Sequence, residues 1–508
     1  MIHSLLFQHA EATPERPFLI FEGRTITYGE MGMLVSAFAD VLESKGVRVG
    51  DHVAMLCSNR PAYLVAWFTL MEIGAVTVPL NVGLVADGLR YTIEQSDARF
   101  VLIEPVLLEA KSVHLDNLAS SPEIILIDGA VEAVNGEEVK RRDQSLEELK
   151  EATLNSILYT SGTTGLPKGV MIPNGAYMAA GKDMSAALAM SADDRILVFL
   201  PLFHANPQMY AVASAVTVGA SIILLPAFNA KEFFDVVRRT QATGFTYVGT
   251  VLSLLDKRNP GPRSDHMLRW CVGGGAPAEI WEAIESRFGL AVHELYGMTE
   301  TGGWVTMNVA GDSRRGTVGH PRSGIAIEIR AADGRVLAAG EKGEIVARSD
   351  RPHILFPGYW KNPEATAETL VDGWLHTGDR GHLDSDRFLV FDGRVKELIR
   401  RGGEMISPVE IEQQLLRHPS VRECAVVPEP DDVMDEEIRA VIVANGSVAA
   451  QELNIFLRDS LPRYMMPRYY SFVEQLPKTE TEKIQRNRVT PMNDDTVDLR
   501  LQAKGIPL

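Results

Sequence analysis

The sequence predicts an α/β protein, with a large N-terminal domain of two doubly wound α/β subdomains and a small β-barrel, followed by a small α+β C-terminal domain. Three observations predict this fold. Helix-like and strand-like segments alternate in the first third of the chain and again from Arg195 to about Met298, as in parallel sheets covered by helices on both faces. From Thr317 to Val390 short strands and frequent turns indicate a small antiparallel sheet or barrel. The remaining residues combine helices and strands in a separate α+β unit.

Glycines mark the ends of the predicted helices in the first third. An amphipathic helix from 27 ends at Gly46, and a strongly apolar one from 60 ends at Gly74. The buried strands predicted around them from apolar runs are 51–57, 75–80 and 99–104.

One long stretch raises the question of a membrane span. No formally charged side chain occurs between Arg195 and Lys231. However, Gly219 interrupts the apolar run and Pro226 lies near its end, so we expect a buried helix over 207–218, a glycine stop and a strand. No integral membrane segment is predicted.

The alternation continues to about Met298, and short strands and then a mixed unit follow it. After the strand at 220–226, the sequence predicts a helix over 232–241 and strands over 245–250 and 268–275. The short strands of the predicted barrel are 324–337, 343–349 and 387–393. The C-terminal unit is predicted to contain helices at 408–418 and 450–461 and strands at 421–430 and 439–445.

Composition disfavours several classes of partner. Lys and Arg number 50 and Asp and Glu 67, giving a net charge of −17 over 508 residues. This balance disfavours nucleic acid or an anionic membrane as the main partner, but it is compatible with a local basic site for small anions.

Cysteine usage and the N-terminus predict the compartment. Cys57, Cys271 and Cys424 are far apart, and no CxxC pair or Cys/His cluster predicts zinc or a disulfide framework. Residues 1–17 lack a basic segment followed by a long apolar core, so no signal peptide is predicted. We therefore expect a reducing, cytoplasmic location.

The stretch YTSGTTGLPKGV, from Tyr159 to Val170, lies between two apolar runs. Its glycines would let backbone amides approach an anion, its hydroxyls add donors, and Lys168 supplies a positive charge. It is not a Walker loop, because Pro167 precedes the lysine. Taken alone, a surface hairpin turn would have a similar composition.

Further motifs follow in order along the chain. GGGAP offers bare backbone to a planar ring, YGMTE combines an aromatic face with a hydroxyl and a carboxylate, and GWLHTGD ends in a carboxylate suited to a ribose diol. A cationic segment with a Gly-Gly turn and a lysine-containing loop come last. These five stretches are 273–277, 296–300, 373–379, 393–412 and 476–486.

Together these motifs resemble the superfamily of adenylate-forming enzymes, which includes acyl- and aryl-CoA synthetases, nonribosomal-peptide adenylation domains and beetle luciferases. The resemblance runs in order to about Arg488, leaving 494–508 outside. It implies an N-terminal AMP-binding domain over 1–395 and a mobile C-terminal lid domain over 396–508. The implied activity is that of an AMP-forming carboxylic acid–CoA ligase, with ATP, Mg²⁺, coenzyme A and a small carboxylic acid as ligands.

The resemblance also implies nucleotide-binding residues. Thr299 would donate to the α-phosphate of ATP and Glu300 would bind Mg²⁺, while Asp379 and Arg394 would take the ribose hydroxyls. The residues implied to hold the β- and γ-phosphates are Thr160, Ser161, Gly162, Thr163, Thr164, Gly165 and Lys168. Those implied to enclose the adenine are Gly274, Gly275, Ala276 and Tyr296. Gly297 and Met298 are implied to be cofactor-binding as well.

Two lysines match positions that act in different half-reactions. Lys483 matches the mobile lysine that reaches the α-phosphate and the substrate carboxylate, but Glu482 replaces the glycine that usually precedes it. Lys396 falls at the hinge about which the C-terminal domain is thought to rotate. Gly402 and Gly403 would then flank the pantetheine channel, although a simple β-turn would use the same two residues.

The substrate end is implied less directly. His204 lies where acyl and aryl synthetases carry a histidine near the substrate carboxylate. No aspartate that could meet an ammonium group occurs in 203–211, so we expect an acid without a free α-amino group. The residues expected to line the acyl pocket are Asn206, Gln208, Thr250, Met298 and Trp304.

Three alternatives stay open. A stand-alone adenylation enzyme would load an acyl-carrier protein instead of CoA; the lack of a fused carrier domain favours free CoA. A luciferase-like oxygenase and a non-catalytic nucleotide-binding protein are the others, and near-complete motifs argue against the last.

Overall fold

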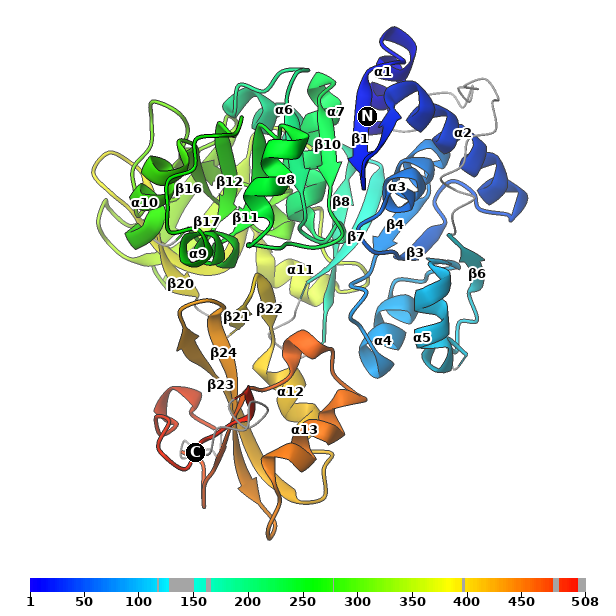
Figure 1. Ribbon diagram of the computed structural model, residues 1–508. Helices are drawn as coiled ribbons and strands as arrows, with labels where there is room; N and C mark the ends of the chain where they lie inside the picture. The colour runs from blue at the N-terminus through cyan, green and yellow to red at the C-terminus, as the bar shows by residue number, and fades with distance from the viewer. Residues whose placement is uncertain are drawn as a thin grey trace. The chain divides into compact units, whose positions relative to one another are not determined.

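The computed structural model describes residues 1–116, 118–127, 150–160, 166–276, 278–394, 398–477 and 484–500. The chain divides into two compact units (Figure 1). The first comprises Met1–Val82, Ile93–Tyr159 and Gly169–Val395, and the second comprises Gly83–Thr92, Thr160–Lys168 and Lys396–Leu508. The predicted α/β class, with a large N-terminal and a small C-terminal part, is confirmed.

A nine-stranded sheet forms one half of the first unit. Strands β1, β10, β9, β11, β12 and β13 run parallel, and β2, β14 and β15 are antiparallel additions at its edges. In spatial order the strands are β15 (His320–Pro321), β14 (Thr306–Met307), β13 (Ala291–Tyr296), β12 (Trp270–Gly274), β11 (Gly244–Val248), β9 (Arg195–Val198), β10 (Ser221–Leu224), β1 (Pro17–Phe21) and β2 (Arg24–Thr27).

A second sheet has six strands and carries the other α/β half. Its central strands β5, β3 and β4 are parallel and almost entirely buried, as expected for a sheet covered on both faces. In spatial order the strands are β6 (Glu123–Leu126), β5 (Phe100–Ile103), β3 (His52–Leu56), β4 (Val76–Pro79), β7 (Leu154–Thr160) and β8 (Lys168–Pro173).

The predicted short-strand region is a five-stranded antiparallel sheet. Strand β19 lies at its centre, between β17 on one side and β18 and β20 on the other. The strands are β16 (Ile325–Arg330), β17 (Gly343–Ser349), β18 (Leu370–Val371), β19 (Trp374–Leu383) and β20 (Leu389–Arg394).

The second unit is built on a six-stranded sheet. Its longest pair, β23 with β24, is antiparallel over ten or more residues a strand, and the helices of this unit contribute to the buried core beside it. The strands are β21 (Ile399–Arg401), β22 (Glu404–Ile406), β23 (Val421–Asp431), β24 (Asp435–Ala444), β25 (Tyr469–Phe472) and β26 (Val497–Asp498).

Helix boundaries follow the local signals in the sequence. Thr27 and Glu30 form a reciprocal capping box at the start of α2, and Gly74 ends α3 in a left-handed conformation. The α-helices of eight or more residues are α1 (Ile2–Ala12), α2 (Tyr28–Ser44), α3 (Pro61–Ile73), α4 (Ala86–Gln95), α5 (Pro105–Leu115), α6 (Asn174–Ala187), α8 (Phe233–Thr240), α9 (Gly249–Arg258), α10 (Ala278–Phe288), α12 (Pro408–Leu415) and α13 (Ala450–Arg458). Shorter helical segments are α7 (Ala213–Val218) and α11 (Pro363–Thr369).

The long uncharged stretch is core, with one difference from the expected helix. Its first part, Pro207–Val212, is a π-helix, which continues into α7 and ends at Gly219. A Cβ at Gly219 would lie 2.9 Å from Cε1 of His9, and its φ of +75° favours glycine. Within the described residues, no helix has the length and apolar character needed to cross a bilayer.

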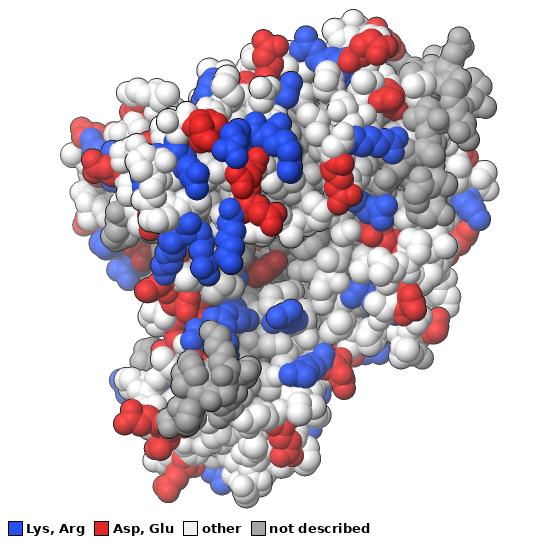
Figure 2. Space-filling model, in the orientation of Figure 1, with Lys and Arg blue, Asp and Glu red and all other residues white. Residues whose placement is uncertain are grey.

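Many charged side chains lie on the surface, whereas the cysteines lie in the interior. Acidic and basic side chains both occur on the face of the molecule shown in Figure 2. Cys57, Cys271 and Cys424 are all buried and unpaired with one another. Burial raises the pKa of the Cys271 thiol well above its usual value and that of Cys424 to about 12.

Candidate active site

Three neighbouring parallel strands end at one edge of the nine-stranded sheet. β11, β12 and β13 are paired in parallel register, so their carboxyl ends lie side by side. The predicted motifs at 273–277 and 296–300 come directly at the ends of β12 and β13. In open α/β sheets, ligands bind outside the carboxyl ends of the strands, so this edge is the candidate site.

Packing against the neighbouring strand requires a glycine at the end of β12. A Cβ at Gly273 would lie 2.0 Å from the carbonyl oxygen of Tyr247, so the neighbouring backbone of β11 excludes any larger residue. Gly275 has a φ of +90°, which turns the chain away from the strand. Gly274, Gly275 and Ala276 therefore lie at the sheet edge, directly after β12.

A buried carboxylate that the sequence did not reveal holds this turn. Glu294 is 5% exposed and accepts hydrogen bonds from the backbone N–H of Gly275 at 2.6 Å and of Ala276 at 2.9 Å. The hydroxyl of Tyr247 donates to the same carboxylate at 2.6 Å. Glu294 lies only two residues before the predicted Tyr296 motif. A glutamate within a strand is not distinctive, however, so the sequence did not indicate its role.

The predicted adenine face and ribose carboxylate are in contact. The Tyr296 hydroxyl donates to Asp379 at 2.7 Å, and Asp379 is 2% exposed. The Tyr296 ring lies 5.8 Å from the Phe391 ring between centroids. The structure thus brings together two residues 83 positions apart in the sequence.

The two residues predicted to bind the ribose, Asp379 and Arg394, are also neighbours through the backbone. Asp379 and Arg394 are opposite each other in the β19–β20 ladder. The backbone of Asp379 is fixed by two further hydrogen bonds. Its N–H donates to Thr377 Oγ1 at 3.1 Å, and that hydroxyl donates to the carbonyl of Ile345 at 2.7 Å.

The residues after β13 form a tight turn that buries the predicted metal ligand. Thr299–Thr301 is a single 3₁₀ turn. Glu300 is 4% exposed, and its carboxylate accepts a hydrogen bond from Tyr359 at 2.8 Å. Burial, and then the neighbouring Glu300 carboxylate, raise the pKa of the Tyr359 hydroxyl, so it stays a donor to Glu300 at neutral pH.

This carboxylate fits a magnesium ion that is shared with a nucleotide. Mg²⁺ is usually held by one or two carboxylates together with substrate phosphates, not by a complete protein cage. Within the described residues, no group of three or more His, Cys, Asp or Glu side chains could hold a metal by itself. A single buried carboxylate beside the nucleotide motifs therefore suits Mg²⁺ that arrives with ATP.

The predicted substrate residues precede the π-helix. His204 follows a turn in which its N–H donates to the carbonyl of Pro201 at 3.0 Å, and its ring lies 4.6 Å from that of Phe203. Asn206 donates to the carbonyl of Tyr247 at 3.1 Å, at the end of β11. Because π-helical turns are frequent at functional sites, the position next to one agrees with the predicted role.

Gln208 differs from the expectation that it lines the acyl pocket. It is 0% exposed, accepts from Tyr177 at 2.5 Å, and donates to Tyr63 at 3.1 Å and to Leu202 at 2.7 Å. Its amide is therefore engaged within the core. Of the two amides expected in the pocket, Asn206 and Gln208, the second is therefore structural.

The other pocket candidates lie at the same sheet edge. Thr250 is in the first turn of α9, directly after β11, and Met298 precedes the 3₁₀ turn. Trp304 is 3% exposed, with the Arg322 guanidinium 5.3 Å from its ring. Burial lowers the pKa of Arg322 to about 10.

The predicted phosphate loop connects two adjacent strands. Thr160 ends β7 and Lys168 begins β8. Ser161, Gly162, Thr163, Thr164 and Gly165 lie outside the described residues.

The Gly-Gly turn of the second unit is a two-residue hairpin. Arg401 and Glu404 pair across it, and Gly402 and Gly403 have φ values of +59° and +90°. A tight hairpin with positive φ at both central residues favours glycine at each. The N–H of Gly402 also donates to the carbonyl of Met434 at 2.9 Å.

The segment with the predicted mobile lysine is fixed at its flanks. Lys483 and Glu482 lie outside the described residues, as does Lys396. The N–H of Gln485 donates to the carbonyl of Pro477 at 2.8 Å, which ties the two ends together. Arg486 contacts the Glu412 carboxylate of α12 at 2.8 and 2.5 Å.

Comparison with known proteins gives consistent results over nearly the whole chain. Residues 6–360 match the AMP-binding enzyme family, and residues 410–483 match the AMP-binding enzyme C-terminal domain. A crotonobetaine/carnitine–CoA ligase of Salmonella paratyphi C is 31% identical over 92% of this chain and 95% of its own length.

Among solved structures, o-succinylbenzoate CoA synthetase of Bacillus subtilis is similar in two complexes. A double mutant bound to a product analogue has a TM-score of 0.87 and 29% identity, covering 97% of this chain and 99% of that one. The complex with its acyl-adenylate intermediate has a TM-score of 0.70 and 28% identity, covering 96% and 98%.

Proposed function

Because the chain belongs to the family of AMP-binding enzymes, we propose that it is an AMP-forming carboxylic acid–CoA ligase. The observation that carries this conclusion is the similarity to CoA ligases over more than nine-tenths of both chains. A carboxylate oxygen attacks the α-phosphorus of ATP, and the bond to pyrophosphate breaks. The CoA thiolate then attacks the acyl carbon, and AMP leaves.

The first step brings two anions together, so catalysis is largely alignment and charge neutralisation. Residues Thr160–Gly165 with Lys168 hold the β- and γ-phosphates in this proposal, and Thr299 donates to the α-phosphate. Lys483 supplies a positive charge at the attacking carboxylate. Mg²⁺ at Glu300 would neutralise phosphate charge.

In this proposal, adenosine is held by residues at the ends of β12 and β13 and in the β19–β20 ladder. The backbone of Gly274–Ala276, with Tyr296, Gly297 and Met298, encloses the adenine, and Asp379 with Arg394 takes the ribose hydroxyls. The contact between Tyr296 and Asp379 supports this assignment, because it fixes the orientation of the carboxylate before the nucleotide binds.

Replacing Glu294 with glutamine tests the support of the adenine site. The amide leaves one acceptor oxygen for three donors, so we expect the free energy of unfolding to fall by about 1–3 kcal/mol. The KM for ATP should rise while the KM for the acid changes little. Thermal unfolding and initial rates measure both. Glu282→Gln is the matched control, since its side chain is 73% exposed; equal behaviour of the two variants would contradict the role of Glu294.

The second half-reaction uses the C-terminal part of the chain. We place the domain boundary between 395 and 396, with Lys396 as the hinge. Rotation there replaces Lys483 with the face that carries Gly402 and Gly403, and the narrow pantetheine arm passes beside this turn. The tight hairpin supports the role, because it presents backbone without side chains.

The acid is expected to lack a free α-amino group. His204 lies at the substrate carboxylate in this proposal, and 203–211 contains no aspartate to meet an ammonium group. Burying an unpaired ammonium would cost several kcal/mol. Asn206 and Thr250 are the polar groups of the acyl pocket; within the described part of the chain, Asn206 Oδ1 and Thr250 Oγ1 have no hydrogen-bond partner.

Incubation with ATP, Mg²⁺ and matched panels of simple acids and amino acids, with and without CoA, tests the function. We expect pyrophosphate release with a simple acid and thioester formation only when CoA is added. Omitting Mg²⁺ should abolish both. Robust adenylation of amino acids, or acyl transfer only to a carrier protein, would contradict the proposal.

A further inference from the structure

Residues 484–500, which follow the family's C-terminal match, are part of the second unit. That match ends at residue 483, yet β26 (Val497–Asp498) pairs antiparallel with β25. The Thr496 hydroxyl lies 2.9 Å from that of Ser471. Residues 496–500, the tail segment, are therefore attached to this sheet by strand pairing and by a side-chain contact.

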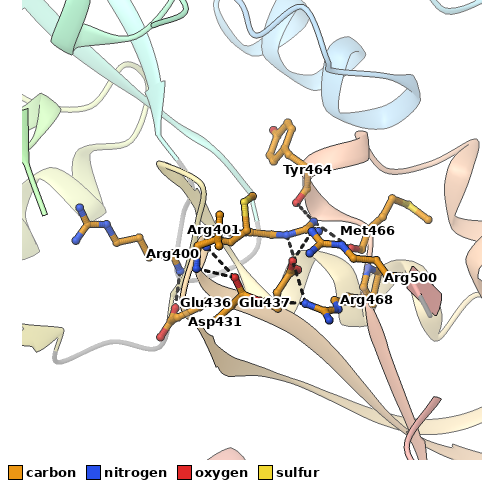
Figure 3. Close-up of polar contacts among 12 residues, drawn as sticks. Arg400, Arg401, Asp431, Glu436, Glu437, Tyr464, Met466, Arg468 and Arg500 are labelled. Carbon is orange, nitrogen blue, oxygen red and sulfur yellow. Dashed lines mark hydrogen bonds and ion pairs between the residues drawn. The ribbon is translucent and has the colours of Figure 1, made fainter. Parts of the chain in front are cut away.

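The tail segment reaches a carboxylate in the centre of this unit. Glu437 of β24 is 0% exposed, and Figure 3 shows arginines converging on it. Arg500 lies 2.5 Å from its Oε1, and Arg401 lies 2.7 Å from its Oε2. Because each oxygen meets a different arginine, the carboxylate is held in one orientation. A buried carboxylate is tolerated only when it is paired in this way.

A second contact fixes the tail segment to the same cluster. Asp498 accepts from Arg468 at 2.8 Å and 3.2 Å, and Arg468 lies 3.8 Å from Glu437 (Figure 3). Arg468 is therefore occupied mainly by Asp498 and by Asp431, at 3.0 Å. The tail segment thus contacts both arginines that lie near Glu437 Oε1, because it supplies Arg500 itself and pairs Asp498 with Arg468.

The other side of the cluster is the Gly-Gly hairpin. Arg401 is the residue directly before Gly402, and besides Glu437 its guanidinium donates to the carbonyls of Tyr464 at 2.7 Å and Met466 at 3.2 Å. Among the described residues, Glu437 is the anion that contacts Arg401. The Glu437 carboxylate is therefore one of the contacts that hold the base of the hairpin.

We propose that the tail segment is a positioning element for acyl transfer to CoA, acting from Arg500 through Glu437 to Arg401 and the Gly402–Gly403 hairpin. Arg500 is a positioning residue and need not touch either substrate. This inference rests on the proposed role of the hairpin in the CoA half-reaction. It assigns a function in that reaction to residues beyond the family match.

Arg500→Ala is the primary test, in the full-length enzyme. Because Arg500 is 47% exposed, its ion pair is partly screened, and we expect the KM for CoA to rise by about three- to fivefold. Pyrophosphate release in the absence of CoA should be unchanged. Arg500→Lys should restore most of the affinity, whereas Arg500→Glu, which places a like charge beside Glu437, should raise the KM further. The difference from wild type should narrow at high salt.

Arg458→Ala is the matched control, since Arg458 is exposed at the end of α13 and makes no ion pair among the described residues. Asp498→Asn is a second variant, which weakens the contact with Arg468. Asp498 Oδ1 also accepts from the backbone N–H of Arg500 at 2.8 Å, so this variant loosens the tail segment as a whole and its KM for CoA should rise as well. If Arg500→Ala lowers both half-reactions equally, or only the melting temperature, the tail segment is merely stabilising and the proposal is overturned.

Amide hydrogen exchange separates this inference from the proposed function. Arg500→Ala should speed exchange at Gly402, whose N–H donates to Met434, and leave amides of β12 unchanged. Faster exchange in an enzyme that does not use CoA would overturn the acceptor assignment and keep the link between tail and hairpin. Unchanged exchange at Gly402 would overturn the link itself.

Discussion

Replacing Lys483 with alanine is expected to slow acyl-adenylate formation by about a hundredfold or more, because it removes a positive charge where two anions react. Thioester formation from a supplied acyl-adenylate should be nearly unaffected, since the α-phosphate has already been attacked in that substrate. Pyrophosphate release measures the first step, and CoA consumption from synthetic adenylate measures the second.

Two neighbouring variants sharpen this test. Lys478→Ala removes a lysine from the same segment and should leave both steps intact. Glu482→Gly restores the residue that usually precedes the lysine and should preserve or accelerate adenylation. Equal loss of both half-reactions in Lys483→Ala would contradict the assignment, and a large loss in Glu482→Gly would give the glutamate a role of its own.

Replacing Lys396 with proline is expected to have the opposite effect. Proline fixes φ near −65° and removes a backbone donor, so a hinge that must rotate is held near one conformation. Pyrophosphate release should persist, while CoA-dependent turnover should fall by about a hundredfold, the cost of misplacing reacting groups. Single-turnover assays of each half-reaction measure the two effects.

Lys396→Ala distinguishes rotation from the lysine side chain. It removes the charge but leaves φ free, so its CoA-dependent turnover should stay close to that of wild type. If the proline variant also transfers acyl groups to CoA at the wild-type rate, no rotation about this residue is needed and the hinge assignment is wrong.

The fold was predictable from the sequence where the signal is local. Gly74 and Gly219 end helices in left-handed conformations, and apolar runs became the buried strands β3, β4 and β5. Pairing between distant segments was not predictable. Leu19 of β1 lies opposite Ile222 of β10, so the N-terminal hairpin completes a sheet built mostly from residues after 195. Such pairings depend on packing across the whole domain, which periodicity does not contain.

In the candidate site too, residues in local motifs were predictable and residues that act through distant contacts were not. Motif matching indicated Tyr296, Asp379 and Glu300 because their spacing within short stretches is distinctive. It did not indicate Glu294 or Tyr359, which act through a hydrogen bond to another residue. Gln208 was expected to line the pocket, but its hydrogen-bond partners come from two other helices and a turn. The roles of the phosphate-loop residues and of the two lysines stay predictions.

Because all three cysteines are buried, the folded enzyme should react only slowly with thiol-modifying reagents. Thiolates attack maleimides and disulfide reagents, and here the native thiols are buried and, at Cys271 and Cys424, have a raised pKa. A single cysteine introduced at exposed Arg458 should therefore take up a fluorophore at one position without removing any natural residue beforehand. Conversely, the rate at which the unaltered chain is modified reports how often its interior opens, so covalent labelling can time unfolding directly.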